Sequence, residues 1–214
     1  MLKLYSYFRS SSAYRVRIAL NLKGVAYEVI PVHLPHGGGQ QHQAQFVERN
    51  PAHLVPVLED GPLKLTQSLA IIEYLEECYP APSLLPADPA TKAWVRALAL
   101  DIVCEIQPLN NLRVLQQLKS EYALDEHARA KWSREWLNRG FTAIETKLAS
   151  NRSVDYCFGT APTLADCCLI PQVFNAHRLR CEMARFPNIM RIYEACMACE
   201  AFQKATPGSQ IDAE

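Results

Sequence analysis

Short apolar runs alternate with helical patterns in the first third of the chain. Four runs of apolar, β-branched and aromatic residues predict strands, at residues 2–5, 27–32, 55–59 and 63–65. Three stretches with apolar residues at helical spacing lie between and after them, at residues 13–23, 43–49 and 67–79. The predicted order is strand, helix, strand, helix, then two strands and a last helix.

This order restricts the topology of the predicted sheet. Two strands joined by a helix should be parallel, with a right-handed crossover. Asp60 and Gly61 are a turn signal between the third and fourth strands, which predicts an antiparallel hairpin. We therefore expect a small mixed sheet with helices on both faces.

The remainder of the chain reads as helical. Four prolines mark a linker, at residues 80, 82, 86 and 89, and no strand signal follows it. Long amphipathic stretches cover residues 90–118, 125–149, 164–176 and 189–204. Thr163 and Asp166 have the spacing of a capping box at the start of one of them. We expect an α/β domain at residues 1–82 and an all-α domain at residues 89–214.

Composition narrows the class of protein. Lys plus Arg and Asp plus Glu both number 22, so the net charge is zero, which argues against nucleic acid as the main partner. No apolar run reaches the length of a membrane span. The N-terminus lacks the charged start, apolar core and cleavage site of a signal peptide. We expect a cytoplasmic protein that binds neither membranes nor nucleic acid.

Cysteines and histidines give no sign of a metal site in the sequence. Eight cysteines without a signal peptide do not suggest a disulfide framework. Cys196 and Cys199 form a CxxC pattern, but it falls within a predicted helix, which favours reduced thiols. His33 and His36 lie in a loop rich in Pro and Gly with no acidic residue nearby in sequence, which favours a solvated loop.

Three consecutive serines, Ser10, Ser11 and Ser12, follow Arg9 where the first strand gives way to the first helix. A helix N-terminus presents N–H groups and a partial positive charge, so it suits an anion. N-capping alone needs one serine. Three hydroxyls and an arginine exceed that need, so we favour a functional site over a cap.

The chain has no cysteine before Cys78, so this corner cannot carry dithiol chemistry. It is suited to a thiolate supplied from outside, such as that of glutathione. A free thiol has a pKa of about 8.5, and a hydrogen bond to a charged group contributes roughly 1.5–3 kcal/mol. Together with the helix terminus, such a bond lowers a thiol pKa by about one to three units.

Two further segments suit a peptide-like ligand. Val55 precedes Pro56 at a strand entry, where a cis bond would turn the Val55 backbone toward a ligand's own backbone. Gln67 and Ser68 open a helix, so a ligand carboxylate could accept from its N–H groups and from the Ser68 hydroxyl. A simple helix cap at Ser68 explains the sequence equally well.

Several segments carry a resemblance over nearly the whole chain. They are Tyr7-Phe8-Arg9-Ser10-Ser11, Arg15-Val16-Arg17-Ile18-Ala19-Leu20, Gln67-Ser68, Ala70-Ile71-Ile72-Glu73-Tyr74-Leu75-Glu76, Gln107-Pro108-Leu109-Asn110-Asn111, and Ala165-Asp166 with Pro171-Gln172-Val173. With these segments the chain resembles the zeta class of glutathione transferases, which includes isomerases of maleylacetoacetate and maleylpyruvate. The resemblance implies a thioredoxin-like N-terminal domain, an all-α C-terminal domain, a homodimer and glutathione as cofactor.

The resemblance also implies roles for particular residues. Ser10 would donate to the glutathione sulfur, with Ser11 assisting and Arg9 beside them. The residues implied to hold glutathione are Ser10, Ser11, Ser12, Gln41, Val55, Gln67, Ser68, Gln107 and Asn111. Gln107 and Asn111 would reach it from the helical domain or from a second subunit. Arg9 and Arg178 would face the carboxylates of a small dicarboxylic substrate.

The implied reaction is the glutathione-dependent cis–trans isomerisation of maleylacetoacetate to fumarylacetoacetate, in the breakdown of aromatic amino acids. The family commonly reads Ser-Ser-Cys, and Ser12 here excludes a cysteine-based role. Leu112 matches the maleylacetoacetate type, because some maleylpyruvate-type relatives have arginine there. Maleylpyruvate isomerisation, conjugation or dehalogenation of small electrophilic acids, and a non-enzymatic binding protein remain the alternatives.

Overall fold

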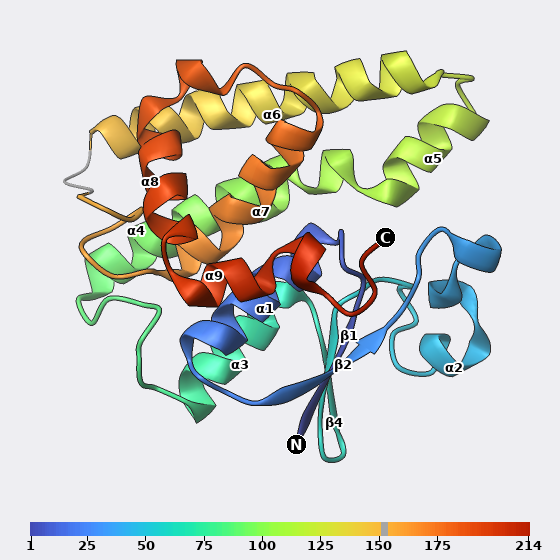
Figure 1. The fold of residues 1–214 in the computed structure, drawn as a ribbon, viewed down its shortest axis with the longest axis horizontal. Helices are drawn as coiled ribbons and strands as arrows, with labels where there is room; N and C mark the ends of the chain where they lie inside the picture. Colours follow the sequence, from blue (N-terminus) through green and yellow to red (C-terminus); the bar gives the residue numbers. More distant parts are fainter. Residues whose placement is uncertain (151–153) are drawn as a thin grey trace. The chain divides into compact units, whose positions relative to one another are not determined.

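The computed structural model describes residues 1–150 and 154–214, and they form two compact units. One unit comprises Met1–Leu84 with Met197–Glu214, and the other comprises Leu85–Cys196 (Figure 1). Sequence analysis placed residues 89–214 in one helical domain. In the structure the last 18 residues, Met197–Glu214, belong to the unit that contains the sheet, because helix α9 (Glu200–Ala205) packs against α1 (Ser11–Leu22).

The sheet has four strands in the order β2-β1-β3-β4. Their bounds are β1 (Leu2–Ser6), β2 (Tyr27–Pro31), β3 (Val57–Asp60) and β4 (Leu63–Thr66). β1 runs parallel to β2, whereas β3 runs antiparallel to both β1 and β4. This arrangement confirms the mixed sheet and the hairpin that the sequence predicts.

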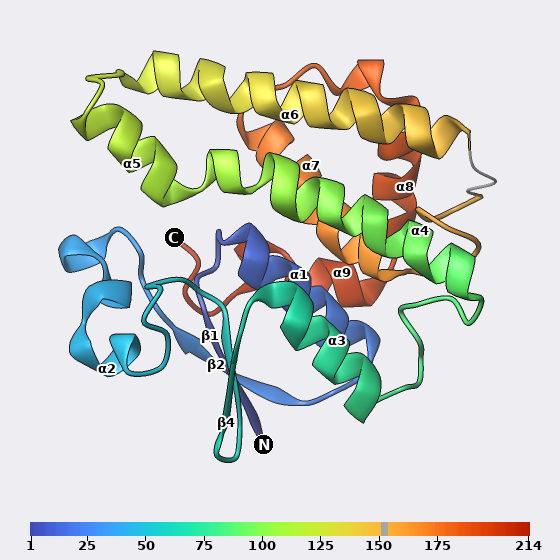
Figure 2. The same cartoon turned by 180° about the vertical axis from the view of Figure 1, so that it is seen from behind.

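Helices cover both faces of this sheet. Helix α1 packs against α3 (Ser68–Cys78) on one face, and α2 (Ala44–Val47) lies on the other (Figures 1 and 2). Side chains of β1 alternate between the faces: Leu4 is fully buried, and Tyr5 belongs to the apolar cluster that contains Phe46 of α2. The unit is therefore the thioredoxin-like domain that was expected.

The described residues of the second unit form helices and no strand. Its helices are α4 (Pro89–Leu100), α5 (Leu112–Ser120), α6 (Glu126–Ala149), α7 (Leu164–Arg178) and α8 (Pro187–Met197), whose last residue is counted with the first unit. The single helix predicted at residues 90–118 is interrupted by a π-helical turn, Asp101–Ile106, and a 3₁₀ turn, Pro108–Asn110. Pro108 has no N–H to donate within an α-helix, which explains why regular α-helical bonding does not continue through the 3₁₀ turn.

The helix predicted at residues 189–204 is also divided. α8 ends at Met197, and Cys199 has an extended backbone and caps α9. The CxxC cysteines therefore lie on different elements rather than on one helix. Neither forms a disulfide; Cys196 is buried and Cys199 is partly buried.

Gly140 of α6 permits a close approach to the π-helical turn. A Cβ built at this position would overlap the Ile106 side chain at Cδ1 and Cγ1. Only a residue without a side chain leaves room for Ile106, which is almost completely buried.

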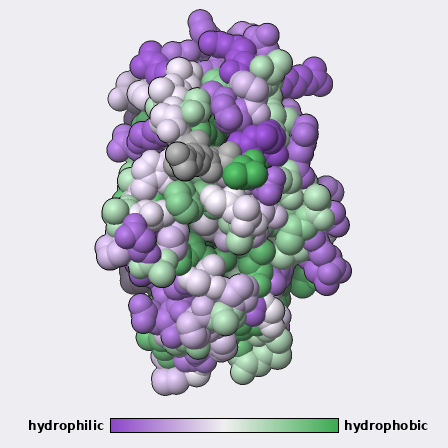
Figure 3. Space-filling model, turned by 90° about the vertical axis from the view of Figure 1, so that its left-hand side faces the viewer, coloured by the Kyte–Doolittle hydropathy of each residue, from purple (hydrophilic) through white to green (hydrophobic). Residues whose placement is uncertain are grey.

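The exterior is mixed in character. On the face drawn in Figure 3, hydrophobic residues are interspersed among hydrophilic ones. Among the residues that the structure describes, no helix combines the length and the apolar character that crossing a membrane requires.

A buried capping box starts α7, as predicted. The Asp166 carboxylate accepts hydrogen bonds from the Thr163 N–H and hydroxyl, both at 2.7 Å, and from the Cys157 N–H at 2.8 Å. Burial raises the pKa of Asp166, although these three donors oppose the shift. The carboxylate thus joins the segment before α7 to the first turn of that helix.

We expect Asp166→Ala to lower the free energy of unfolding by about 2–4 kcal/mol, because it leaves two buried N–H groups without an acceptor. Urea unfolding measures this change. The matched control is Asp88→Ala, since Asp88 caps α4 through the Thr91 N–H but is exposed, and water can replace it. Equal losses in the two variants would contradict the importance of burial.

Candidate functional site

Strand directions bring the predicted site residues of the first unit to one edge of the sheet. β1, β2 and β4 run in the same direction, so the loops that follow them start at the same edge, where β3 begins. The serine corner follows β1, Gln41 lies in the loop after β2, Val55 precedes β3, and Gln67 follows β4. Segments far apart in sequence therefore meet here, as they do in other open α/β sheets.

Ser10 is the N-cap of α1. Its hydroxyl oxygen accepts from the Ala13 N–H at 3.2 Å, and its carbonyl accepts from the Tyr14 N–H at 2.8 Å. The helix starts at Ser11, two residues before the predicted start at residue 13, so Ser11 is its first residue and Ser10 has the capping position.

Capping leaves the Ser10 hydroxyl able to act on a ligand. A hydroxyl has one proton and two lone pairs, and the cap uses only a lone pair. Ser10, Ser11 and Ser12 are all partly exposed, Arg9 is exposed, and the first turn of α1 contains no acidic residue. The corner therefore offers a hydroxyl donor and the positive end of a helix to an anion.

A buried arginine fixes the loop that leads to this corner. Arg17 is fully buried and donates to Ser6 Oγ at 3.0 Å and to the Phe8 carbonyl at 3.0 Å. Its Nε donates to the Ala205 carbonyl at the end of α9, at 3.1 Å. Burial lowers the pKa of Arg17 to about 10, so the side chain stays charged near neutral pH.

The C-terminal segment holds the same loop from a second direction. The buried Asp212 carboxylate accepts from the Phe8 N–H through Oδ2, at 3.0 Å. Phe8 also packs against Tyr7, with ring centroids 4.8 Å apart. Phe8, two residues before Ser10, is thus bound through its backbone N–H to Asp212 near the end of the chain.

The start of α3 forms a second polar position. Gln67 is exposed and has φ 67°, which is uncommon for a residue other than glycine and indicates local strain of the kind found at binding sites. Ser68 is buried and is the first helical residue, so its interpretation as the cap is wrong; Gln67 has the capping position. Arg15 is fully buried and donates to Ser68 Oγ at 3.1 Å.

The remaining predicted positions of this unit also lie at this edge. The Val55–Pro56 bond is cis, as the sequence suggested, and Val55 packs in one apolar cluster with Tyr7 and Phe8. Gln41 is buried, and its Nε2 donates to the Leu34 carbonyl at 3.3 Å. Its Oε1 is buried without a hydrogen-bond partner, which leaves an acceptor for a ligand N–H.

Three predicted residues belong to the second unit. Gln107 follows the π-helical turn, and Asn111 caps α5 by accepting from the Arg113 N–H at 3.2 Å. Arg178 is exposed and is the last residue of α7, which extends two residues beyond the predicted end. Their roles toward a ligand stay predictions.

Comparisons with known proteins agree over both units. Residues 1–77 match the family model "Glutathione S-transferase, N-terminal domain", and residues 123–195 match "Glutathione S-transferase, C-terminal domain". The chain is 49% identical over 210 residues to a protein of Vibrio cholerae named probable maleylacetoacetate isomerase. The aligned region covers 98% of this chain and 97% of that protein.

Two solved structures extend the likeness to three dimensions. One is the holo structure of a maleylpyruvate isomerase described as a bacterial zeta-class glutathione S-transferase, with TM-score 0.96, 45% identity and coverage of 99% and 100%. This chain belongs to the zeta class of the glutathione S-transferase family. The other structure is a maleylacetoacetate isomerase from Anaeromyxobacter dehalogenans with bound dicarboxyethyl glutathione and citrate, at TM-score 0.86, 42% identity and coverage of 100% and 98%.

Sequence reasoning missed three buried charged residues of this zeta-class transferase: Arg15, Arg17 and Asp212. Every residue from Ala13 to Leu20 in α1 is buried, so the helix is covered on all sides rather than along one stripe. Two arginines inside such an apolar run were the available signal, because a buried charge requires partners. Nothing in the sequence indicated that those partners included the C-terminal segment.

We expect Asp212→Ala to destabilise the transferase by about 1–3 kcal/mol, because it leaves the buried Phe8 N–H without an acceptor. Urea unfolding measures the loss, and the Phe8 amide should exchange its hydrogen faster. Asp212→Asn keeps an acceptor oxygen and should retain most of the protection, and Glu200→Ala, at an exposed carboxylate, is the control. Unchanged exchange at Phe8 in Asp212→Ala would contradict the assignment.

Proposed function

We propose that this protein is a glutathione-dependent cis–trans isomerase that converts maleylacetoacetate to fumarylacetoacetate. The observation that carries the proposal is the partly exposed Ser10 hydroxyl at the start of α1, in a chain that is 49% identical to a probable maleylacetoacetate isomerase over nearly its full length. The serine is a donor suited to a thiolate, and the full-length match includes both units.

The residues present fit glutathione. The ligand has a thiol, a peptide backbone and two carboxylates, and the sheet edge has a donor for each acidic group and an acceptor for an N–H. Gln41 Oε1 is buried without a hydrogen-bond partner. Val55 lies just before β3, outside the regular hydrogen bonding of the sheet, and Gln67 has a strained backbone at the start of α3. These positions would hold the tripeptide while Ser10 holds the sulfur.

Bound glutathione supplies a thiolate that adds to the cis double bond of the substrate, allows rotation about the resulting single bond, and is eliminated to leave the trans isomer. The protein contributes by stabilising the thiolate. The Ser10 O–H donates toward the sulfur, and the N-terminus of α1 adds a favourable dipole. A hydrogen bond to a charged group, worth about 1.5–3 kcal/mol, is the larger of these two contributions.

Arg9 and Arg178 are the residues proposed to bind the substrate. Both are exposed arginines, and a guanidinium is suited to paired hydrogen bonds with a carboxylate. The relative from Anaeromyxobacter dehalogenans binds dicarboxyethyl glutathione and citrate, so carboxylate-rich ligands enter its site. Gln107 and Asn111 are proposed to contact glutathione from the helical unit or from a second subunit.

Maleylpyruvate is the second candidate substrate, since a structural relative with TM-score 0.96 is named as its isomerase. Leu112, where some maleylpyruvate-type relatives have arginine, favours maleylacetoacetate. Dehalogenation or conjugation of small electrophilic acids would use the same thiolate.

Further parts of the proposal concern assembly and location. A homodimer follows from the family resemblance. A cytoplasmic location agrees with eight cysteines that form no disulfide, because thiols persist in a reducing compartment. A role in aromatic amino acid breakdown follows from the proposed substrate.

Steady-state kinetics test the proposed reaction. We expect isomerisation of maleylacetoacetate with a higher kcat/KM than that of maleylpyruvate, and a large fall in rate when glutathione is omitted. The same assay with α-halo acids measures dehalogenation. If neither maleyl acid is isomerised while halo acids are turned over, the isomerase assignment is wrong.

We expect Ser10→Ala to raise the pKa of bound glutathione by about one to two units, equivalent to roughly 1.4–2.8 kcal/mol. Turnover should fall more at pH 7 than at pH 9, because higher pH restores thiolate without the hydroxyl. The measurement is the thiolate absorbance of the glutathione complex against pH, for alanine variants of Ser10, Ser11 and Ser12.

Two controls separate this effect from loss of the helix cap. Ser10→Thr retains the hydroxyl and should keep the thiol pKa near that of the unmodified protein. Ser12→Ala keeps the cap at Ser10 and should cause the smallest shift. A larger shift in Ser11→Ala or Ser12→Ala than in Ser10→Ala would move the role to that serine.

A further inference from the structure

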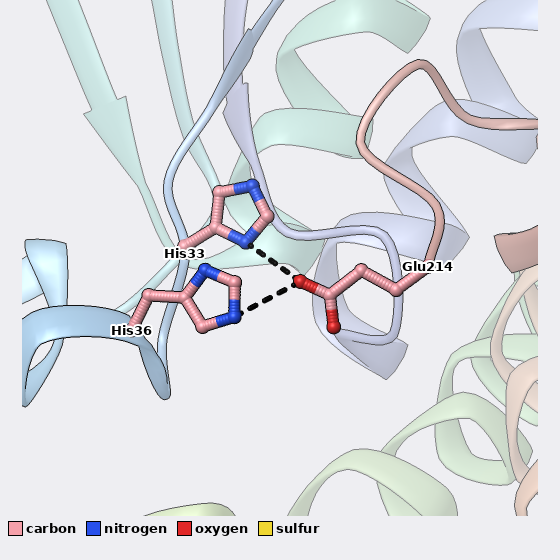
Figure 4. A group of neighbouring side chains, drawn as sticks. All are labelled: His33, His36 and Glu214. Carbon is pink, nitrogen blue, oxygen red and sulfur yellow. Dashed lines mark ion pairs between the residues drawn. The ribbon is translucent and has the colours of Figure 1, made fainter.

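Three potential metal ligands meet next to the serine corner. His33 and His36 lie in the loop after β2, and Glu214 reaches them from the C-terminal segment (Figure 4). Glu214 Oε1 is 3.6 Å from His33 Nδ1 and 3.1 Å from His36 Nε2. One ligand atom of each residue lies within 4.8 Å of the other two. The sequence predicts a solvated loop because no acidic residue is near in sequence, but the fold brings Glu214 to the two histidines.

The two histidines are held in place by their surroundings. The His33 N–H donates to Gln40 Oε1 at 2.8 Å, and the Gln40 N–H donates back to the His33 carbonyl at 2.8 Å. The imidazole rings stack with an interplanar angle of 1° and centroids 4.8 Å apart, and the His33 ring packs edge-on against Tyr7. These contacts fix the loop and the His33 ring. Because the nitrogen lone pairs of two parallel rings lie in parallel planes, the exposed His36 ring turns about its side-chain torsions to share an ion with His33.

The nitrogen that faces Glu214 is available as a ligand. His33 Nδ1 is buried and has no hydrogen-bond partner, because Glu214 Oε1 lies just beyond hydrogen-bonding distance. The His33 side chain is 21% exposed, whereas His36 and Glu214 are 61% and 49% exposed, so an ion can enter from solvent.

The separations between Glu214 and the two histidines are close to those of ligands around a tetrahedral ion. Zinc bonds of about 2.0–2.1 Å at tetrahedral angles place neighbouring ligand atoms about 3.3 Å apart. The two distances to Glu214 Oε1, 3.6 and 3.1 Å, lie on either side of that value. Two imidazoles with one carboxylate are a common ligand set for zinc and related divalent transition ions.

We propose that His33, His36 and Glu214 form a binding site for a divalent transition metal ion of the zinc type. Three protein ligands leave a fourth position for water. The ion ties the loop after β2 to the C-terminal segment, in which Asp212 accepts from the Phe8 N–H. The proposed ligands do not include Ser10, and the site does not depend on the proposed isomerase activity.

Calorimetric titration with zinc chloride tests the site on the full chain. We expect one zinc ion per chain to bind at this site, and each of His33→Gln, His36→Gln and Glu214→Gln to weaken that binding more than tenfold. His127→Gln, at an exposed histidine of α6, is the matched control and should bind like the unmodified protein. All variants retain the eight cysteines, so zinc bound by thiols is common to every titration.

Two further measurements make the outcome decisive. At a hundredfold excess of free zinc over the dissociation constant, the melting temperature should rise by about 5–10 °C in the unmodified protein and His127→Gln, but not in the three ligand variants. Cobalt(II) bound at the site should give tetrahedral absorption without a thiolate charge-transfer band. Zinc affinity unchanged by His36→Gln and Glu214→Gln, or a cobalt spectrum dominated by thiolate, would overturn the proposal.

Discussion

The site depends most on the burial of one charge, the guanidinium of Arg17. A fully buried arginine is costly unless its N–H groups are paired, and here they bind Ser6 Oγ and the carbonyls of Phe8 and Ala205. The same bonds fix the end of β1, the loop before Ser10 and the end of α9. Satisfying this charge therefore determines where the serine corner lies.

The corner then uses one hydroxyl for two purposes. The Ser10 oxygen accepts from the Ala13 N–H and starts α1, while its proton remains for an anion. Stability and ligand binding are thus combined in one side chain rather than divided among three serines. Ser68 is comparable, because it accepts from the buried Arg15 at the start of α3. Buried arginines of α1 donate hydrogen bonds near both helix N-termini: Arg17 to the Phe8 carbonyl before Ser10, and Arg15 to Ser68 Oγ.

The C-terminal segment contributes to the sheet-containing unit beyond what its position in sequence suggests. Its α9 accepts from Arg17, its Asp212 accepts from Phe8, and its Glu214 meets two histidines. Backbone groups of an irregular loop need partners when they are buried, and this segment provides them. The loop that carries the proposed catalytic serine is therefore hydrogen-bonded both to α1 and to the C-terminal segment.

The sequence by itself determined the local elements and most of the candidate site. Apolar, β-branched runs and helical patterns predicted the strands and most of the helices, the capping box at Thr163 and Asp166, and the serines at a strand-to-helix corner. Motif residues placed Gln67 and Ser68 at a second helix start. These features follow from neighbouring residues, so a linear pattern contains them.

Only the tertiary structure decided what depends on distant partners. The assignment of residues 197–214 to the first unit, the burial of Arg15 and Arg17, and the approach of Glu214 to His33 arise from contacts between residues up to 188 positions apart in sequence. The same holds for the divided helix at Cys199, since α9 packs against α1. Periodicity shows that a side chain is buried, but only packing determines which partner satisfies it.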